Sequence, residues 1–82
     1  MARIIDGDVC NLVGRNVRAI RRARHMSQQQ LSNRLELLGV YVCRGSVSRI
    51  EDRCRTVTDI ELFALAKVLD VPLAALFDPP KD

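Results

Sequence analysis

Arginine is the residue type in this chain with the clearest capacity for surface chemistry. Eleven of the 13 basic residues are arginine, and ten of them lie within residues 15–55. Only three acidic residues oppose them there, so this segment carries a net charge of +7, against +3 for the whole chain. A guanidinium group offers a planar set of donors that suits phosphate oxygens and guanine edges. The pattern leaves two interpretations open, a nucleic-acid partner or a solvated helical face.

Cysteine and histidine give no sign of a metal site. Cys10, Cys43 and Cys54 form no Cys-x-x-Cys pair, and His25 has no cysteine near it in the sequence. An odd number of cysteines without a secretion signal argues against a disulfide framework. We therefore expect reduced thiols that pack as small hydrophobic side chains, with no metal and no cofactor. A redox switch would require an exposed thiol of low pKa.

An enzyme is not expected. His25 has no matched nucleophile and orienting acid in any motif, and no glycine-rich phosphate loop is present. His25 instead suits the C-terminal end of a helix, where a cation is compatible with the helix dipole.

Length and composition predict one small domain with one hydrophobic core. The chain has 82 residues and is 48% apolar, too small for two domains and too apolar for disorder. Its longest apolar stretches, such as residues 62–66, are too short to cross a bilayer. The N-terminus lacks the apolar stretch of a signal peptide, so we expect a cytoplasmic protein with no membrane partner.

Apolar spacing predicts five helices joined by short loops, at residues 11–25, 27–39, 44–53, 58–70 and 72–77. The first three carry apolar side chains at helical spacing, namely Val13, Val17 and Ile20, then Leu31, Leu35 and Leu38, then Val47, Ile50 and Cys54. Arginines cover most of the remaining surface of the first helix. Residues 40–42 are β-prone but have no pairing partner, so we expect a loop.

Local signals predict where these helices begin and end. Residues 27–30 and 58–61 both have the form of a capping box, which marks a helix start. Gly39 suits the left-handed residue that ends a helix, and Pro72 ends the fourth helix and begins a fifth. The fourth helix is apolar nearly all round, so we expect it to be buried or covered by a partner.

Four ordered blocks of this pattern resemble the Cro/phage-repressor-like helix-turn-helix family, also called the xenobiotic-response-element (XRE) family. They are SQQQLSNRL at residues 27–35, VSRIE at 47–51, LFALAKVLDV at 62–71 and PLAALF at 72–77. The resemblance covers residues 13–77. It implies an all-α, five-helix repressor-like domain at residues 11–78, in which helices two and three form the helix-turn-helix. Residues 1–10 are then an N-terminal segment and residues 79–82 a C-terminal tail.

The resemblance also implies which residues read DNA. Gln28 corresponds to a phosphate contact that orients the reading helix. Arg44, Gly45 and Arg49 correspond to positions that face base edges. There an arginine can donate two hydrogen bonds to guanine, a contact worth about 1–3 kcal/mol of discrimination.

Other positions of the same helix and of the loop after it complete the implied DNA contacts. Ser46 and Ser48 lie close enough to the reading positions to contact phosphate or base. Arg53 and Arg55 lie in the loop after helix three, where we expect them to contact phosphates, which carry no base information. For these two arginines a solvated surface position is an equally good interpretation.

The chain also departs from the family pattern. Arg21 and Glu51 match a structural ion pair between helix one and the end of helix three, but Glu51 follows Gln28 by 23 positions instead of 18. The five extra residues are expected to lengthen helix two and the connection after it. Cys43 stands where serine or threonine usually caps helix three. Arg53 stands where glycine usually ends that helix, which predicts a different exit or a longer helix.

Two function classes follow from these features. The first is a small bacterial or phage transcriptional regulator that binds double-stranded DNA sequence-specifically, as a homodimer with helix three in the major groove. Its dimer interface is expected at Leu73, Leu76 and Phe77. The alternative is an antitoxin-like or adaptor module that uses the same fold to hold a protein partner.

Overall fold

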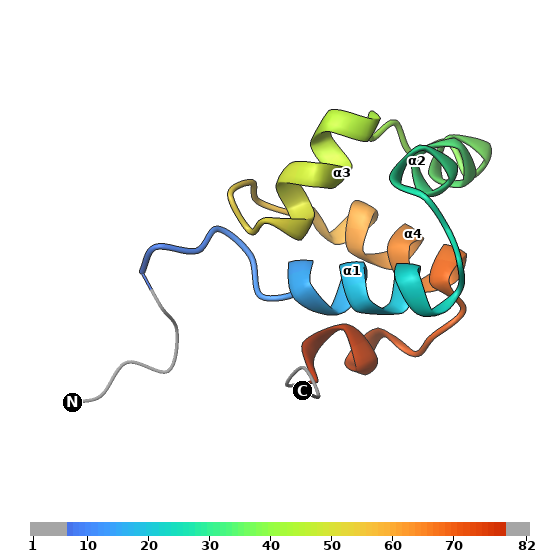
Figure 1. Ribbon diagram of the computed structural model, residues 1–82. Helices are drawn as coiled ribbons and strands as arrows, with labels where there is room; N and C mark the ends of the chain where they lie inside the picture. The colour runs from blue at the N-terminus through green and yellow to red at the C-terminus, as the bar shows by residue number, and fades with distance from the viewer. Residues whose placement is uncertain (1–6, 79–82) are drawn as a thin grey trace.

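The computed structural model describes residues 7–78, which form four α-helices and one short 3₁₀ helix (Figure 1). The helices are α1 (Gly14–Ala23), α2 (Gln28–Leu37), α3 (Arg44–Glu51), α4 (Asp59–Leu69) and η1 (Leu73–Phe77). No strand occurs among the described residues, and residues 40–42 form a loop. The predicted tail, 79–82, and residues 1–6 of the predicted N-terminal segment lie outside the described residues.

The predicted capping boxes are present at the starts of α2 and α4. Ser27 accepts a hydrogen bond from the Gln30 amide, and the Gln30 side chain accepts one from the Ser27 amide. Thr58 and Glu61 make the same reciprocal pair at α4. These contacts satisfy amide groups that no helical carbonyl can reach, so both helices begin where the sequence predicts.

The ends of α2 and α4 use left-handed residues. Gly39 has a φ of 82° after α2, as predicted, and Asp70 has a φ of 57° after α4. Leu38 lies beyond the end of α2 and is 54% exposed, so the predicted apolar stripe of α2 shortens to Leu31 and Leu35. The stripe stops there because residues at helical spacing share one face only while the chain is helical, and α2 ends at Leu37.

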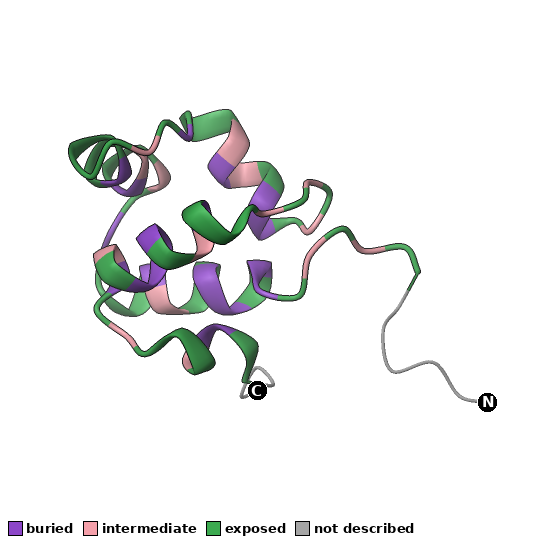
Figure 2. Cartoon of the chain, turned by 180° about the vertical axis from the view of Figure 1, so that it is seen from behind, coloured by how far each residue is buried: buried purple, intermediate pink, exposed green. Residues whose placement is uncertain are grey.

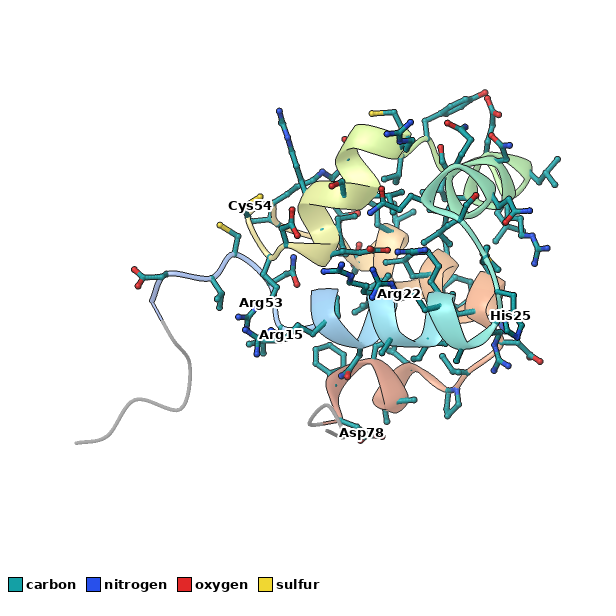
Figure 3. The ribbon with its side chains drawn as sticks, in the orientation of Figure 1. Arg15, Arg22, His25, Arg53, Cys54 and Asp78 are labelled. Carbon is teal, nitrogen blue, oxygen red and sulfur yellow. The ribbon has the colours of Figure 1, made fainter. Side chains whose placement is uncertain are left out.

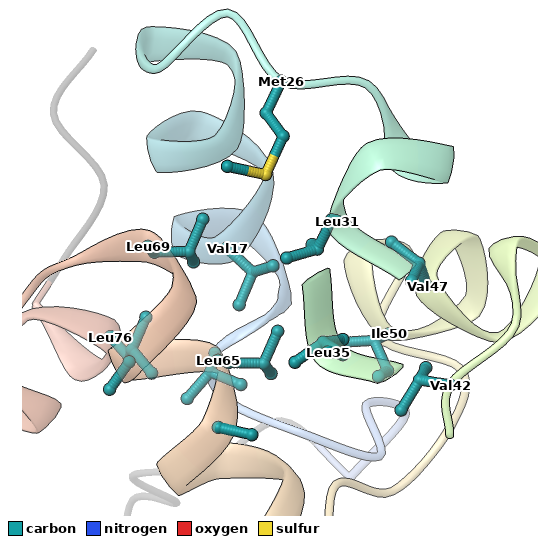
Figure 4. Close-up of a cluster of buried hydrophobic side chains, with 13 residues drawn as sticks. Val17, Met26, Leu31, Leu35, Val42, Val47, Ile50, Leu65, Leu69 and Leu76 are labelled. Atoms are coloured by element: carbon teal, nitrogen blue, oxygen red, sulfur yellow. The ribbon is translucent and has the colours of Figure 1, made fainter. Parts of the chain in front are cut away.

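One hydrophobic core joins all five helices (Figure 4). It contains Val13, Val17, Met26, Leu31, Leu35, Val42, Val47, Ile50, Ala64, Leu65, Ala66, Leu69 and Leu76. Figure 2 shows these buried residues on the sides of the helices that face one another. The helices α1 and α4 run through the middle of the molecule, with α2 and α3 on one side and η1 on the other (Figure 1).

The fifth predicted helix is a short 3₁₀ helix, and it changes the expected dimer surface. Leu76, predicted at a dimer interface, is 0% exposed because η1 packs against α1 and α4. The Asn16 side chain fastens this packing by donating hydrogen bonds to the Leu76 and Asp78 carbonyls. Leu76 is therefore a core residue, and this prediction was wrong. Leu73 and Phe77 remain about half exposed.

The cysteines also differ from expectation. Cys10, Cys43 and Cys54 are all exposed free thiols, so none is packed as a small hydrophobic side chain. Cys54 is not part of the predicted apolar stripe, because α3 ends at Glu51 and Cys54 lies outside the helix.

None of the helices in residues 7–78 combines the length and the apolar character that a membrane span requires.

Candidate nucleic-acid interface

The outer face of α3 carries the polar residues expected to read DNA. Val47, Ile50 and Glu51 are buried, so α3 is held by one side only. Arg44, Gly45 and Arg49 are exposed, and Ser46 and Ser48 are half-buried beside them. The geometry thus presents a short helix with two exposed arginines, backed by α1 and α2.

Exposed arginines of α1 extend this polar face. One hollow is lined by Arg15, Arg18, Arg22 and Arg53 together with Asp52, and a second by Arg18, Arg22 and Arg44 together with Gln28. Arg18 and Arg22 line both hollows, so the two lie next to each other. We call these five arginines, 15, 18, 22, 44 and 53, the arginine surface.

Figure 3 shows Arg15 and Arg53 near each other where α1 begins and α3 ends, with Arg22 further along α1. Sequence reasoning noted a basic face on the first helix but assigned no DNA contact to Arg15, Arg18 or Arg22. The signal was present in the sequence, since these residues lie opposite the apolar stripe of that helix.

Arg21 and Glu51 form the expected ion pair between α1 and α3. The Arg21 Nε atom donates to Glu51 at 2.6 Å, and its Nη2 atom donates to the other carboxylate oxygen at 2.9 Å. Its Nη1 atom donates to the Met26 carbonyl at 2.7 Å, so the guanidinium also holds the α1–α2 connection. The hydrogen bond to Glu51 raises the pKa of Arg21, and both side chains are buried.

Gln28 belongs to the same network. Its side-chain amide donates to Glu51 at 3.1 Å, so one donor of the predicted phosphate contact is used inside the chain. The residue is half-buried and lines the hollow that contains Arg18, Arg22 and Arg44. A phosphate contact from Gln28 would therefore be oriented by Glu51.

Arg55 makes an ion pair that sequence reasoning did not find. Its guanidinium donates to both carboxylate oxygens of Glu61, at 2.9 and 2.7 Å, and to the Thr56 carbonyl. Hydrogen bonds from Arg55 and from the Thr58 amide hold the pKa of Glu61 below its usual range. A DNA phosphate would have to compete with Glu61 for Arg55, whereas Arg53 has no such partner among the described residues.

The chain leaves α3 through a left-handed residue, the conformation that a glycine at this position would adopt. Arg53 adopts a left-handed conformation with a φ of 60°, and the Cys54 amide donates to the Arg49 carbonyl. The expectation of a different exit or a longer helix was wrong, because the helix end tolerates a strained arginine. Such a conformation costs a residue with a Cβ atom about 1–2 kcal/mol.

The start of α3 has no side-chain cap. Cys43 occupies the N-cap position and makes no side-chain hydrogen bond to a helix amide. Its thiol instead lies 3.4 Å from the Ser46 hydroxyl. This hydrogen bond with the Ser46 side chain lowers the pKa of the exposed thiol.

Two further side chains, which the sequence analysis missed, position the interface. Asn11 accepts hydrogen bonds from the Val13 and Gly14 amides and donates to the Ile50 and Arg55 carbonyls, so it joins the start of α1 to the end of α3. An asparagine just before a helix is a recognisable cap signal. Arg24 donates to the Leu69 carbonyl at the end of α4. This contact joins segments that are distant in the sequence, so no local pattern predicts it.

The apolar surface outside the core lies mainly on α4 and on the α2–α3 connection. A groove there is lined by Leu38, Val40, Ile60, Phe63, Ala64 and Lys67. Ile60 is 67% exposed and Phe63 is 62% exposed, with the Lys67 ammonium 5.3 Å from the Phe63 ring centre. Within residues 7–78, no cluster of histidine, cysteine and acidic side chains is arranged to hold a metal ion.

These features define the class of protein. Two helices, α2 and α3, pack together over the core, and α3 presents an exposed polar face that carries Arg44 and Arg49. This arrangement is a helix-turn-helix domain of the repressor-like type.

A comparison with solved structures agrees with this class. The restriction-modification controller protein C.AhdI from Aeromonas hydrophila is 31% identical in sequence and superposes with a TM-score of 0.69. The match covers 80% of this chain and 96% of that chain. At this identity and coverage, the chain belongs to the same family as the controller protein. No family model and no curated protein matches the sequence.

Proposed function

We propose that this protein is a Cro/phage-repressor-like (XRE family) transcriptional regulator that binds double-stranded DNA in the cytoplasm. The observation that carries the proposal is the exposed face of α3, which presents Arg49 to solvent and places Arg44 beside Arg18 and Arg22 of α1. The likeness to a restriction-modification controller protein supports control of transcription as the role.

In this proposal α3 enters the major groove. Arg44 and Arg49 donate to guanine edges, Gly45 lets the DNA approach the helix backbone closely, and Ser46 and Ser48 donate to base or phosphate. Gln28, at the start of α2, donates to a phosphate.

The arginine surface supplies the sequence-independent part of binding. Arg15, Arg18, Arg22 and Arg53 neutralise phosphates and release counterions, so affinity falls as salt is raised. Arg55 contributes less, because Glu61 already holds its guanidinium.

A random-library selection of bound duplexes tests this assignment. We expect Arg49→Ala to relax the preferred sequence at one position, with a loss of about 1–3 kcal/mol. We expect Arg18→Ala to weaken all duplexes similarly and to reduce the slope of log affinity against log salt by about 1. Affinity that stays flat as salt is raised several-fold would overturn DNA binding as the function.

Arg34→Ala is the matched control. It removes the same charge from an exposed position of α2, but Arg34 lines neither hollow of the arginine surface. It should leave the preferred sequence unchanged. A lost preference in Arg34→Ala equal to that in Arg49→Ala would show that net charge, rather than α3, sets the preference.

The regulator would act as a homodimer, because one short reading helix covers only a half-site. Two exposed apolar surfaces could accept the second chain, the groove around Ile60 and Phe63 and the half-exposed pair Leu73 and Phe77. We place the dimer contact at the groove, since Ile60 and Phe63 are more exposed than Leu73 and Phe77.

Sedimentation of Ile60→Glu and Phe77→Glu separates the two surfaces. Both side chains are exposed, so neither variant should disturb the core. Ile60→Glu should dissociate the dimer and Phe77→Glu should leave it intact. The opposite result would move the contact to η1, and a wild-type monomer at micromolar concentration would remove the homodimer from the proposal.

The same groove favours one alternative function, an antitoxin-like or adaptor module that holds a different protein. A stable hetero-complex on co-purification that Ile60→Glu abolishes, together with a monomeric purified chain, would favour this alternative.

A further inference from the structure

Cys10 and Cys54 lie beside each other, although they are far apart in the sequence. The Cys10 amide donates to the Arg53 carbonyl at 2.9 Å. That carbonyl belongs to the peptide group joining Arg53 to Cys54. Standard bond lengths therefore keep the two cysteine Cα atoms within about 7 Å of each other. Disulfides bridge Cα atoms that are about 4.4–6.8 Å apart.

Hydrogen bonds from Asn11 hold the backbone next to Cys10 against the backbone before and after Cys54. Asn11, which follows Cys10, donates to the Ile50 carbonyl at 3.1 Å and to the Arg55 carbonyl at 2.8 Å. These two carbonyls lie before and after Cys54 in the chain. Figure 3 shows Cys54 in the loop after α3, next to the segment that leads into α1.

Both thiols are exposed, so a reagent in solution can reach them. We propose that Cys10 and Cys54 are a modification site that small-molecule disulfides of the glutathione type oxidise to a reversible intramolecular disulfide. The inference is independent of DNA binding.

The chemistry is thiol–disulfide exchange. One cysteine thiolate attacks a sulfur of glutathione disulfide, which releases one glutathione thiolate and leaves a mixed disulfide on the protein. The second cysteine thiolate then attacks the protein sulfur of that mixed disulfide, which forms the Cys10–Cys54 bond and releases the second glutathione. The two cysteines lose two electrons and two protons, and glutathione disulfide gains them as two thiols.

The bond would close a loop that contains α1, α2 and α3. It would tie the start of α1 to the end of α3, a junction that Asn11 already holds by hydrogen bonds. Closing so long a loop restricts the unfolded chain, so the oxidised protein should melt roughly 5–20 °C above the reduced protein.

Intact mass and peptide mapping test the site. The experiment uses the full chain with Cys43→Ser, because the thiol of Cys43 would also react with the reagent. After incubation in a glutathione–glutathione disulfide buffer, the monomer should lose two hydrogens in mass. Trypsin should then release residues 4–15 joined to residues 54–55, each of which carries one of the two cysteines.

Two single variants provide the controls. Cys10→Ser and Cys54→Ser, each with Cys43→Ser, change only exposed side chains, so both should fold. They should show no rise in Tm on oxidation. Failure to form the 4–15/54–55 peptide while both thiols react with glutathione would overturn the proposal. Disulfides found only between two chains would also overturn it.

Discussion

At the scale of single residues, Arg53 is the clearest case of a residue held in an unfavourable backbone conformation. Its φ of 60° suits glycine, yet its side chain is part of the arginine surface. Folding stability and the proposed DNA contact therefore make opposite demands on this position. An arginine at the end of α3 places a charge where a phosphate contact would be useful, at the expense of backbone strain.

Arg53→Gly tests these opposing demands. The variant should raise the free energy of unfolding by about 0.5–1 kcal/mol, because glycine adopts this φ without strain. It should also weaken binding to every duplex by a similar factor, because one phosphate contact is lost. Urea denaturation and duplex titration measure the two effects.

Arg49→Gly is the matched control, since the same substitution falls inside α3. There it should lower stability by about 1 kcal/mol, because glycine is a poor helix former. If Arg53→Gly were equally destabilising, strain at Arg53 would not be the explanation for its behaviour.

At the scale of elements, Gly14 sets the distance between α1 and α3. A Cβ atom at Gly14 would lie 2.0 Å from the Ile50 carbonyl oxygen, well inside van der Waals contact. The first turn of α1 can approach the end of α3 only because this residue has no side chain. The same approach brings Arg15 beside Arg53 on the arginine surface.

Gly14→Ala should therefore lower the free energy of unfolding by about 1–3 kcal/mol, the usual range for overpacking. Gly45→Ala is the control, because a Cβ atom there meets nothing within 4 Å. That variant should raise stability by about 0.5–1 kcal/mol through helix propensity. Equal effects in thermal denaturation would mean that α1 and α3 can separate freely.

Glu61 makes the stability of α4 depend on pH. Its carboxylate caps the helix and pairs with Arg55, so the pKa of Glu61 lies below the value of about 4.3 that it has in an unfolded chain. A lowered pKa contributes stability that is complete above about pH 4.3. This contribution is lost as pH falls through the folded pKa.

Glu61→Gln should lower the free energy of unfolding at pH 7 by about 1.5–3 kcal/mol, the range for hydrogen bonds to a charged group. The difference from the wild type should shrink as pH falls below about 4. Asp59→Asn, an exposed carboxylate of the same turn, should cost about 0.3–1 kcal/mol. Urea denaturation between pH 7 and pH 3 measures both, and a pH-independent difference would contradict the role of the Glu61 charge.

At the scale of the whole molecule, the pair of Arg21 and Glu51 joins three helices. Arg21 lies on α1 and also holds the Met26 carbonyl before α2, while Glu51 ends α3 and accepts from Gln28. Both side chains are buried. The pair therefore fixes how α3 sits on the rest of the domain and, with it, where Arg44 and Arg49 point.

Arg21→Met should cost about 3–5 kcal/mol of stability, because it leaves the Glu51 carboxylate buried without its partner. Glu51→Met should cost a similar amount, and the double variant should cost much less than the sum of the two. Arg22→Met, an exposed neighbour, should change stability by less than about 0.5 kcal/mol. Additive single effects in this double-mutant cycle would contradict a coupled pair.

The order of the helices and the starts of α2 and α4 were predictable from the sequence. Apolar spacing at Val13 and Val17, the two capping boxes and Gly39 each depend on residues within one or two helical turns, and all are present in the structure. Predictions failed where they extended a helix past its real end, as for Leu38 and Cys54. The family resemblance supplied the ion pair of Arg21 and Glu51, which no local pattern could supply.

The sequence by itself determined a one-domain, all-helical chain with a basic middle segment, because composition and helical periodicity are local properties. Only the tertiary structure decided what each charged or apolar group faces. It gathered arginines of α1 and α3 on one surface, paired Arg55 with Glu61, buried Leu76 and placed Cys10 beside Cys54. Each of these outcomes depends on which distant segments meet when the core closes, and that packing decides which side chains remain exposed.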